Sequence, residues 1–228
     1  MPRGTTLAWR YVLGGSIGRG GFGITYLAFD IIDKKTVAVK EYSPSMLAVR
    51  ERGKHVIPNC EKNAAQFNEG EEKFFNEAEL VRQFNGNPNI VIIYECFYAN
   101  NTAYFIMEYL NGIMPENYVK AHGVLIENQA AYISDKLTMA LAILHSGGVL
   151  HRDISLDNLM LCKDKTVKLI DFGAARQCVY NGTRGYTAIF FFRESVVRGE
   201  AQNELRSRKR VYLANLKKIP AKRGFSDC

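Results

Sequence analysis

The most restrictive feature of this sequence is His-Arg-Asp-Ile-Ser-Leu-Asp-Asn at residues 151–158, followed by Asp-Phe-Gly at residues 171–173. The residues between the two motifs form two short apolar runs around a polar turn, which predicts a β-hairpin. Because a hairpin folds back on itself, we expect Asp153, Asn158 and Asp171 to meet at one end of a small sheet. Two carboxylates and an amide oxygen suit Mg²⁺, a hard cation that takes oxygen ligands and bridges phosphates.

The formal net charge of +7 is concentrated at the C-terminal end of the 228-residue chain. Residues 1–182 hold 19 Lys and Arg against 19 Asp and Glu, whereas residues 183–228 hold 11 against 4. A neutral body with a basic tail argues against nucleic-acid binding by the main domain, so we expect no nucleic-acid partner.

Targeting and redox signals point to an ordinary intracellular chain. No run approaches the roughly 18–20 apolar residues that span a bilayer, and the first residues lack the apolar core of a signal peptide. The five cysteines are scattered and never form a Cys-x-x-Cys pair, which favours free thiols over disulfides or a zinc site. We therefore expect a cytoplasmic protein without a transmembrane segment.

Residues 11–41 read as three strands, and the turn between the first two is rich in glycine. Gly18, Gly20 and Gly23 form a Gly-x-Gly-x-x-Gly pattern, in which backbone N–H groups can approach phosphates closely because no Cβ intervenes. A dinucleotide-binding turn has the same pattern but needs a following helix, whereas β-prone residues follow Gly23. A phosphate-covering hairpin is favoured, and an ordinary glycine-rich hairpin is the alternative.

The third strand carries Val-Ala-Val-Lys at residues 37–40, and a lone lysine in this place is usually a solvated edge residue. Residues 42–70 are polar and irregular, so we expect a long loop or an insertion there. Residues 71–84 have helical spacing, with an apolar stripe that includes Phe74 and Val81.

Glu77 borders this apolar stripe, where a carboxylate normally keeps its head in water. A lysine on the adjacent strand, Lys40, would make Glu77 its ion-pair partner. Glu72 and Glu79 are competing choices, but the helical spacing directs them away from the stripe.

Two further strands, residues 90–93 and 103–107, flank a polar turn at residues 100–102, which gives the first lobe five strands and one helix. Residues 111–112 are the predicted crossing into a second lobe. Residues 127–146 have the clearest helical periodicity and end at two glycines.

The motifs occur in one order along the chain: glycine-rich turn, Val-Ala-Val-Lys, helical glutamate, His-Arg-Asp motif and Asp-Phe-Gly. In this order they resemble protein kinases, and the residues within the motifs look like those of bacterial serine/threonine protein kinases. The resemblance implies an α+β, protein kinase-like two-lobe fold. Residues 10–110 would form a five-stranded N-lobe with one helix, and residues 111–182 a truncated, mostly helical C-lobe.

The resemblance implies ATP and Mg²⁺ as cofactors and a protein bearing Ser or Thr as the substrate. Asp153 would orient the substrate hydroxyl or accept its proton. Asn158 and Asp171 would hold Mg²⁺ on the nucleotide, and Lys40, oriented by Glu77, would position the α- and β-phosphates.

The resemblance also implies a pocket for the rest of the nucleotide, with the glycines over the phosphates, a gatekeeper beside a hinge, and two side chains on the faces of adenine. These residues are Gly18, Gly20, Gly23, Ala38, Lys40, Met107, Glu108, Leu110 and Met160.

Several positions depart from the family pattern. Ser155 stands where many protein-phosphorylating members carry a lysine on the γ-phosphate, and Thr25 replaces the usual valine over adenine. No Ala-Pro-Glu segment follows Arg176, so we expect a truncated or frameshifted C-lobe with residues 183–228 as a basic tail. Residues 201–219 carry a helical apolar stripe, so a membrane-surface or nucleic-acid-binding helix is the alternative for the tail.

The predicted function is transfer of the γ-phosphate of ATP to Ser or Thr hydroxyls of proteins. The main alternative is a catalytically impaired, pseudokinase-like fragment that only binds nucleotide, because the substrate platform is missing. A small-molecule phosphotransferase of the same fold is disfavoured by Arg152 and Phe172, and a basic nucleic-acid-binding protein is the last alternative.

Overall fold

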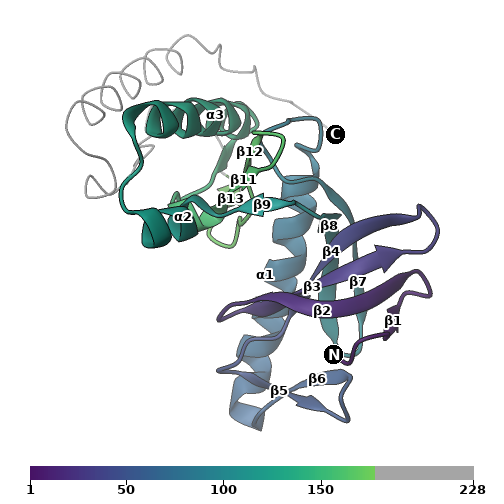
Figure 1. Cartoon of the computed structure of the whole chain (residues 1–228). Helices are drawn as coiled ribbons and strands as arrows, with labels where there is room; N and C mark the ends of the chain where they lie inside the picture. The colour runs from purple at the N-terminus through teal and green to yellow at the C-terminus, as the bar shows by residue number, and fades with distance from the viewer. Residues whose placement is uncertain (178–228) are drawn as a thin grey trace, which may run out of the picture. The chain divides into compact units, whose positions relative to one another are not determined.

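The computed structural model describes residues 1–177, so the predicted basic tail and its helical stripe lie outside the described residues. The chain divides into two compact units, Met1–Asn111 and Gly112–Cys228, and the second is described as far as residue 177. Figure 1 shows the helices and strands of the two units.

Unit 1 is built on an antiparallel sheet of six strands in the order β1-β2-β3-β4-β8-β7. This sheet has one strand more than the five predicted for the lobe, because β1 is a two-residue edge strand with no alternation to detect, and unit 1 holds eight strands in all. The strands of the sheet are β1 (Thr6–Leu7), β2 (Tyr11–Arg19), β3 (Gly23–Asp30), β4 (Lys35–Tyr42), β7 (Ile93–Ala99) and β8 (Thr102–Glu108).

The strand predicted at residues 90–93 was misplaced, because β7 begins only at Ile93. Ile90 is buried without belonging to β7, and a short apolar run does not distinguish a strand from other buried segments. The predicted turn is confirmed at Asn100 and Asn101, which have φ values of 50° and 57°. Two residues with positive φ form the tight turn that matches the twist of a hairpin, and Asn tolerates this conformation.

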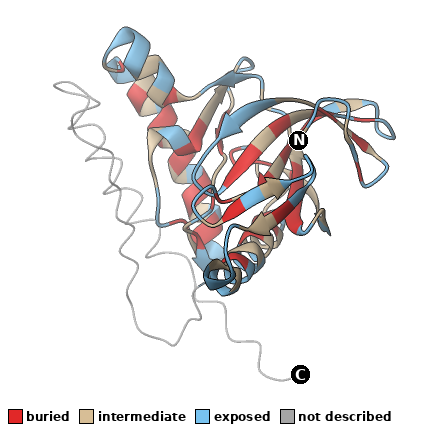
Figure 2. Ribbon diagram, turned by 90° about the horizontal axis from the view of Figure 1, so that it is seen from below, coloured by how far each residue is buried: buried red, intermediate tan, exposed pale blue. Residues whose placement is uncertain are grey.

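The strands contribute alternate residues to the main apolar cluster of unit 1, and the central strands β4 and β8 are buried on both faces. Figure 2 shows where buried residues lie along the chain. Ten residues form this cluster: Leu7, Tyr11, Leu13, Ile24, Tyr26, Ala28, Val37, Val39, Tyr104 and Ile106.

Helix α1 spans Ala64–Arg82 and packs along β7 and β8 (Figure 1). The predicted apolar stripe is confirmed, but the helix begins seven residues before the predicted start at residue 71. The stripe extends back to Phe67, which is buried. Gly70 weakened the helical pattern, yet a Cβ there would lie 2.1 Å from the hydroxyl of Tyr42, so only glycine fits this contact.

The segment predicted as a loop at residues 42–70 is largely regular. It contains a hairpin of β5 (Ala48–Glu51) and β6 (His55–Pro58), the 3-10 helix η1 (Glu61–Asn63) and the start of α1. Its polar composition concealed the hairpin, because these strands are short and only Ala48 and Val56 are fully buried in them.

Unit 2 confirms the predicted helix at residues 127–146 as α3 (Glu127–Ser146), which ends at Gly147. A shorter helix, α2, was not predicted. The predicted hairpin between the two opening motifs is confirmed as β11 and β12, with Leu159 opposite Leu169. The remaining elements are α2 (Pro115–His122), β9 (Gly112–Ile113), β10 (Val149–Leu150), η2 (Leu156–Asn158), β11 (Leu159–Cys162), β12 (Val167–Leu169) and β13 (Arg176–Gln177).

Among the helices of residues 1–177, none is both long and apolar enough to cross a bilayer.

Candidate functional site

The glycine-rich turn joins β2 to β3 and is closed by a hydrogen bond from Gly20 N to Gly23 O of 3.0 Å. A strand follows the glycines, so the dinucleotide-turn alternative is wrong for this chain. The glycines differ in whether a side chain could be accommodated at their position. A Cβ on Gly23 would lie 2.3 Å from the backbone oxygen of Glu41, whereas a Cβ on Gly20 would meet no atom within 4 Å. Gly23 therefore serves the packing of β3 on β4, and the backbone at Gly20 is open to a ligand.

Lys40 lies on β4 between Thr25 of β3 and Phe105 of β8. Its Nζ lies 5.5 Å from the ring centroid of Phe105 and 5.9 Å from that of Phe74 on α1. Glu77 is half-buried and follows Phe74 by three residues, which is one helical turn. The structure thus brings the Lys40 ammonium to the stretch of α1 that carries Glu77.

The competing glutamates of α1 are directed elsewhere. Glu79 accepts a hydrogen bond of 3.2 Å from Arg82 and faces the thiol of Cys96 on β7. Burial, together with Glu79, raises the pKa of the Cys96 thiol to about 12, so this thiol stays protonated at neutral pH. Glu72 is exposed. Of the three glutamates considered from the sequence, Glu77 is the one that remains as a partner for Lys40.

The predicted adenine-binding residues of unit 1 are adjacent in the sheet. Ala38 lies directly opposite Leu27 on one side and Met107 on the other. Glu108 is fixed twice to Ile92, because its N–H donates to Ile92 O at 3.0 Å and its Oε1 accepts from Ile92 N at 2.8 Å. Leu110 follows β8 and is half-buried, as expected for a segment that leads out of the sheet.

In unit 2 the three polar groups of the opening motifs meet as predicted. Asn158 Nδ2 donates to both the backbone oxygen and Oδ2 of Asp153, each at 3.0 Å. Ile170 N donates to Asn158 O at 3.0 Å, which places Asp171 at the same end of the β11–β12 hairpin. Met160 lies on β11 opposite Lys168 and is half-buried.

The backbone of the His-Arg-Asp motif is held in an unusual conformation. Arg152 has a φ of 70°, in the left-handed region that a non-glycine residue enters at an energetic cost. His151 is buried against Phe172, with ring centroids 4.9 Å apart, and its Nδ1 accepts from Asp153 N at 3.4 Å. The packing on Phe172 holds His151, and the hydrogen bond to His151 Nδ1 holds the backbone of Asp153. The Asp153 residue is exposed to solvent.

The donor set of this end of the hairpin fits Mg²⁺ on a phosphate ligand. Asn158 uses its amide nitrogen for Asp153, which directs its Oδ1 to the opposite side of the amide group. Within residues 1–177 no group of three or more His, Cys, Asp or Glu side chains could hold a metal ion alone. Mg²⁺ commonly binds through one or two carboxylates and takes its other ligands from substrate phosphates and water. Asp171 and Asn158 are therefore suited to a metal that arrives with a nucleotide.

Glu41 was missed in the sequence, although it directly follows Lys40. Its carboxylate is fully buried and accepts hydrogen bonds from Tyr26 Oη at 2.9 Å and Tyr104 Oη at 2.6 Å. The guanidinium of Arg50 on β5 completes the cluster with an ion pair. A signal was available, because the period of two in β4 places residue 41 on the same face as the buried Val39.

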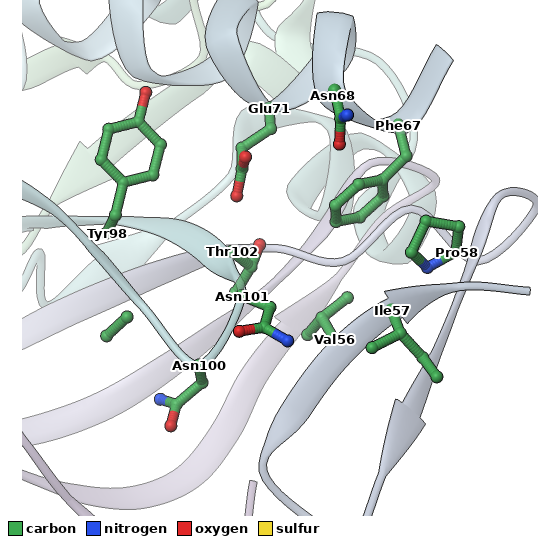
Figure 3. A pocket seen from close by; sticks show the side chains of 11 residues that line it. Val56, Ile57, Pro58, Phe67, Asn68, Glu71, Tyr98, Asn100, Asn101 and Thr102 are labelled. Atoms are coloured by element: carbon green, nitrogen blue, oxygen red, sulfur yellow. The ribbon is translucent and has the colours of Figure 1, made fainter. Parts of the chain in front are cut away.

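A cavity of about 510 Å³ lies in unit 1 among α1, β6 and the β7–β8 turn (Figure 3). Phe67, Asn68 and Glu71 of α1 face Asn101 and Thr102 across it. None of the predicted site residues lines this cavity. The residues of unit 1 that were predicted to bind the nucleotide therefore lie elsewhere, mainly on the glycine-rich turn, β4 and β8.

His145 at the end of α3 gives unit 2 an acid sensitivity. Burial, with a smaller effect of His151, lowers the pKa of His145 from 6.5 to about 4. The unfolded chain therefore binds more protons than the folded chain between pH 6.5 and pH 4, and stability is lost as the pH falls through that window. From pH 7 to pH 5 we expect a loss of about 2 kcal/mol, measured by urea unfolding. His145→Gln should remove the part of the loss that His145 contributes and leave the part due to the buried His151, whose pKa burial also lowers. The same change at the exposed His122 should leave the whole loss intact.

Comparisons with known proteins agree with this geometry. A family profile described as "Protein kinase domain" matches residues 11–197. The serine/threonine-protein kinase PrkC of Bacillus subtilis is 30% identical over 175 residues, which cover 77% of this chain and 24% of PrkC. A protein of Clostridium acetobutylicum named "Probable serine/threonine-protein kinase" is 32% identical over 176 residues, covering 76% of this chain and 23% of the relative.

The chain is also similar to a eukaryotic kinase and to a solved structure. Mitogen-activated protein kinase 15 of Caenorhabditis elegans is 31% identical over 162 residues, which cover 70% of this chain and 30% of that protein. A solved structure titled "PpkA-294 apo form" has a TM-score of 0.68 and 27% identity, covering 99% of this chain and 69% of that chain. The chain spans less than a third of the length of these three curated relatives.

Proposed function

Because the chain belongs to the protein kinase family, we propose that it transfers the γ-phosphate of ATP to Ser or Thr hydroxyls of proteins. The observation that carries the proposal is the hydrogen-bonded group of Asp153 and Asn158 beside Asp171 at one end of the β11–β12 hairpin. These three residues have the types and order that phosphoryl transfer requires, namely a carboxylate for the hydroxyl and two oxygen donors for the metal.

Bound Mg·ATP would supply the phosphoryl group and the positive charge that offsets the charge on its oxygens. Asp153 would hold the substrate hydroxyl through its exposed carboxylate and take up the hydroxyl proton. Asn158 would keep Asp153 oriented through its amide nitrogen and offer its amide oxygen to the metal, with Asp171 as the second ligand. Lys40 would bind the α- and β-phosphates, and Glu77 would orient Lys40.

The nucleotide pocket in this proposal uses the open backbone at Gly20 over the phosphates and the Ala38–Met107 pair beside adenine. Gly18, Gly23, Glu108, Leu110 and Met160 complete the proposed set. We also propose that the protein acts in the cytoplasm, which rests on the sequence alone.

The test is incubation of the purified full chain with Mg·ATP and a library of Ser- and Thr-containing peptides. Mass spectrometry should find phosphate on Ser and Thr and none on Tyr. Binding of Mg·ATP without any transfer would contradict the kinase proposal and favour the nucleotide-binding alternative. That alternative has one departure in its favour, Ser155 in place of the lysine that contacts the γ-phosphate in many relatives.

Removal of the metal gives a second prediction. In the wild type, EDTA should weaken ATP binding about tenfold or more, because Asp171 and Asn158 would bind the nucleotide only through Mg²⁺. Asp171→Asn should bind ATP weakly with and without Mg²⁺, as measured by calorimetric titration. Asp164→Asn, at the opposite end of the same hairpin, should keep the wild-type dependence on Mg²⁺. Equal Mg²⁺ dependence in the two variants would exclude Asp171 as a metal ligand.

A further inference from the structure

The residues Ser43–Pro58, which we name the post-lysine segment, contact the glycine-rich turn directly. Ser43 N donates to Phe22 O at 3.0 Å, and Ser45 N donates to Gly21 O at 3.3 Å. Both acceptors are backbone carbonyls at the tip of the β2–β3 hairpin. The tip is therefore bound to a second part of the chain and is held by more than its own strands.

The tip has little other support. The β2–β3 ladder ends at the pair Arg19 and Ile24, so Gly21 and Phe22 lie beyond its last rung. The side chain of Phe22 is 78% exposed, and a Cβ on Gly21 would meet no atom within 4 Å. With no packed side chain to fix it, the tip is held by the Gly20 N–Gly23 O hydrogen bond that closes the turn and by the hydrogen bonds from the post-lysine segment.

The post-lysine segment is itself firmly anchored in unit 1. Arg50 forms the buried ion pair with Glu41, the neighbour of Lys40 in β4. Val56 is fully buried, and its N–H donates to Asn100 O of the β7–β8 turn at 3.0 Å. The segment is thus fixed to β4 and to the β7–β8 turn while it holds the glycine-rich tip.

We propose that the post-lysine segment positions the glycine-rich turn for the phosphates of Mg·ATP, with the Ser43 and Ser45 amides as the positioning groups. This inference rests on the proposed function. A tip that is already fixed loses less conformational freedom when a ligand binds, so the segment raises affinity for the nucleotide without touching it.

Ser45 permits a selective test. Leu47 N donates to Pro44 O at 3.0 Å, so Ser45 occupies the second position of this turn, which proline favours. Ser45→Pro removes the donor to Gly21 O at an exposed position, and Ser45→Ala removes the hydroxyl while it keeps the donor. Comparison of Ser45→Pro with Ser45→Ala therefore separates the effect of the backbone N–H donor from the effect of the side-chain hydroxyl.

We expect Ser45→Pro to weaken Mg·ATP binding about three- to tenfold relative to Ser45→Ala, the range that one net hydrogen bond supports. Adenosine, which lacks phosphates, should bind both variants equally. Affinities come from calorimetric titration of the full chain. Equal Mg·ATP affinities, or an equal loss for adenosine, would overturn the proposal.

Amide hydrogen exchange without nucleotide separates this inference from the proposed function. Exchange in residues 19–24 should be faster in Ser45→Pro than in Ser45→Ala, whereas exchange in β8 should be the same in both. If the wild type failed to bind Mg·ATP, the proposed function would be wrong. Hydrogen exchange without nucleotide would still decide whether the post-lysine segment fixes the tip. Unchanged exchange in residues 19–24 would overturn the positioning role.

Discussion

Asp153→Asn should lower the rate of phosphate transfer by a factor of about 10²–10⁴, the usual contribution of a positioned general base. The substitution removes the carboxylate that would take the hydroxyl proton. It preserves the local structure, because an asparagine oxygen can still accept the hydrogen bond from Asn158 Nδ2. Affinity for Mg·ATP should therefore stay within about twofold of the wild type, since Asp153 is not proposed to bind the nucleotide. Transfer to peptides under single-turnover conditions measures the first quantity, and calorimetric titration the second.

Asp157→Asn is the matched control for this prediction. Asp157 lies in the same loop, is also exposed and carries the same carboxylate, but it has no role in the proposed site. Its transfer rate should match the wild type. If Asp157→Asn were as slow as Asp153→Asn, the loss would reflect general disturbance of the loop, and Asp153 would have no special role. A normal rate in Asp153→Asn would remove the proposed base altogether.

The short-range parts of the site could be predicted from the sequence. A hairpin needs only two apolar runs and a polar turn, so the meeting of Asn158 with Asp153 followed from the spacing of residues 151–171. The strand that carries Val-Ala-Val-Lys was likewise predicted from a short apolar run, and it is β4. These features depend on neighbours within about twenty residues, which the sequence displays directly.

Long-range features could not be predicted in the same way. The start of α1 near Ala64 was missed because Gly70 weakens the helical pattern. A glycine is needed at this position because the hydroxyl of Tyr42 lies against it, a contact between residues far apart in the sequence. The β5–β6 hairpin was missed because it buries few apolar side chains and is held by Arg50 on Glu41. A glutamate at an inward position of a strand and an arginine nine residues later become partners only after the strand and hairpin have packed.

The buried Glu41 explains why the hairpin belongs to the folded core of unit 1. A carboxylate removed from water needs both a charged partner and hydrogen bonds, and Glu41 has the Arg50 guanidinium and the hydroxyls of Tyr26 and Tyr104. Burial alone would lower the pKa of Arg50, but its hydrogen bond to Glu41 and the nearby negative charge raise it overall. Arg50 therefore stays charged, and its removal would leave the buried carboxylate of Glu41 without its charged partner.

Arg50→Met should reduce the free energy of unfolding of the chain by roughly 3–5 kcal/mol, the range for breaking one side of a buried ion pair. Methionine keeps most of the volume of the side chain and removes the charge, so the loss reports the uncompensated carboxylate of Glu41. Urea unfolding at pH 7, followed by circular dichroism, measures the change. Arg82→Met is the control, because its ion pair with Glu79 is about half exposed and should contribute less than about 1 kcal/mol.

A second variant separates the charge of Glu41 from its packing. In Glu41→Gln/Arg50→Met both charges of the ion pair are gone, and the glutamine oxygen can still accept from a tyrosine hydroxyl. The double variant should recover roughly 2 kcal/mol relative to Arg50→Met, because the penalty of an unpaired buried charge disappears. If the two variants were equally unstable, the loss would come from the packing of the β5–β6 hairpin, and the ion pair would not be what binds this hairpin to the strand that carries Lys40.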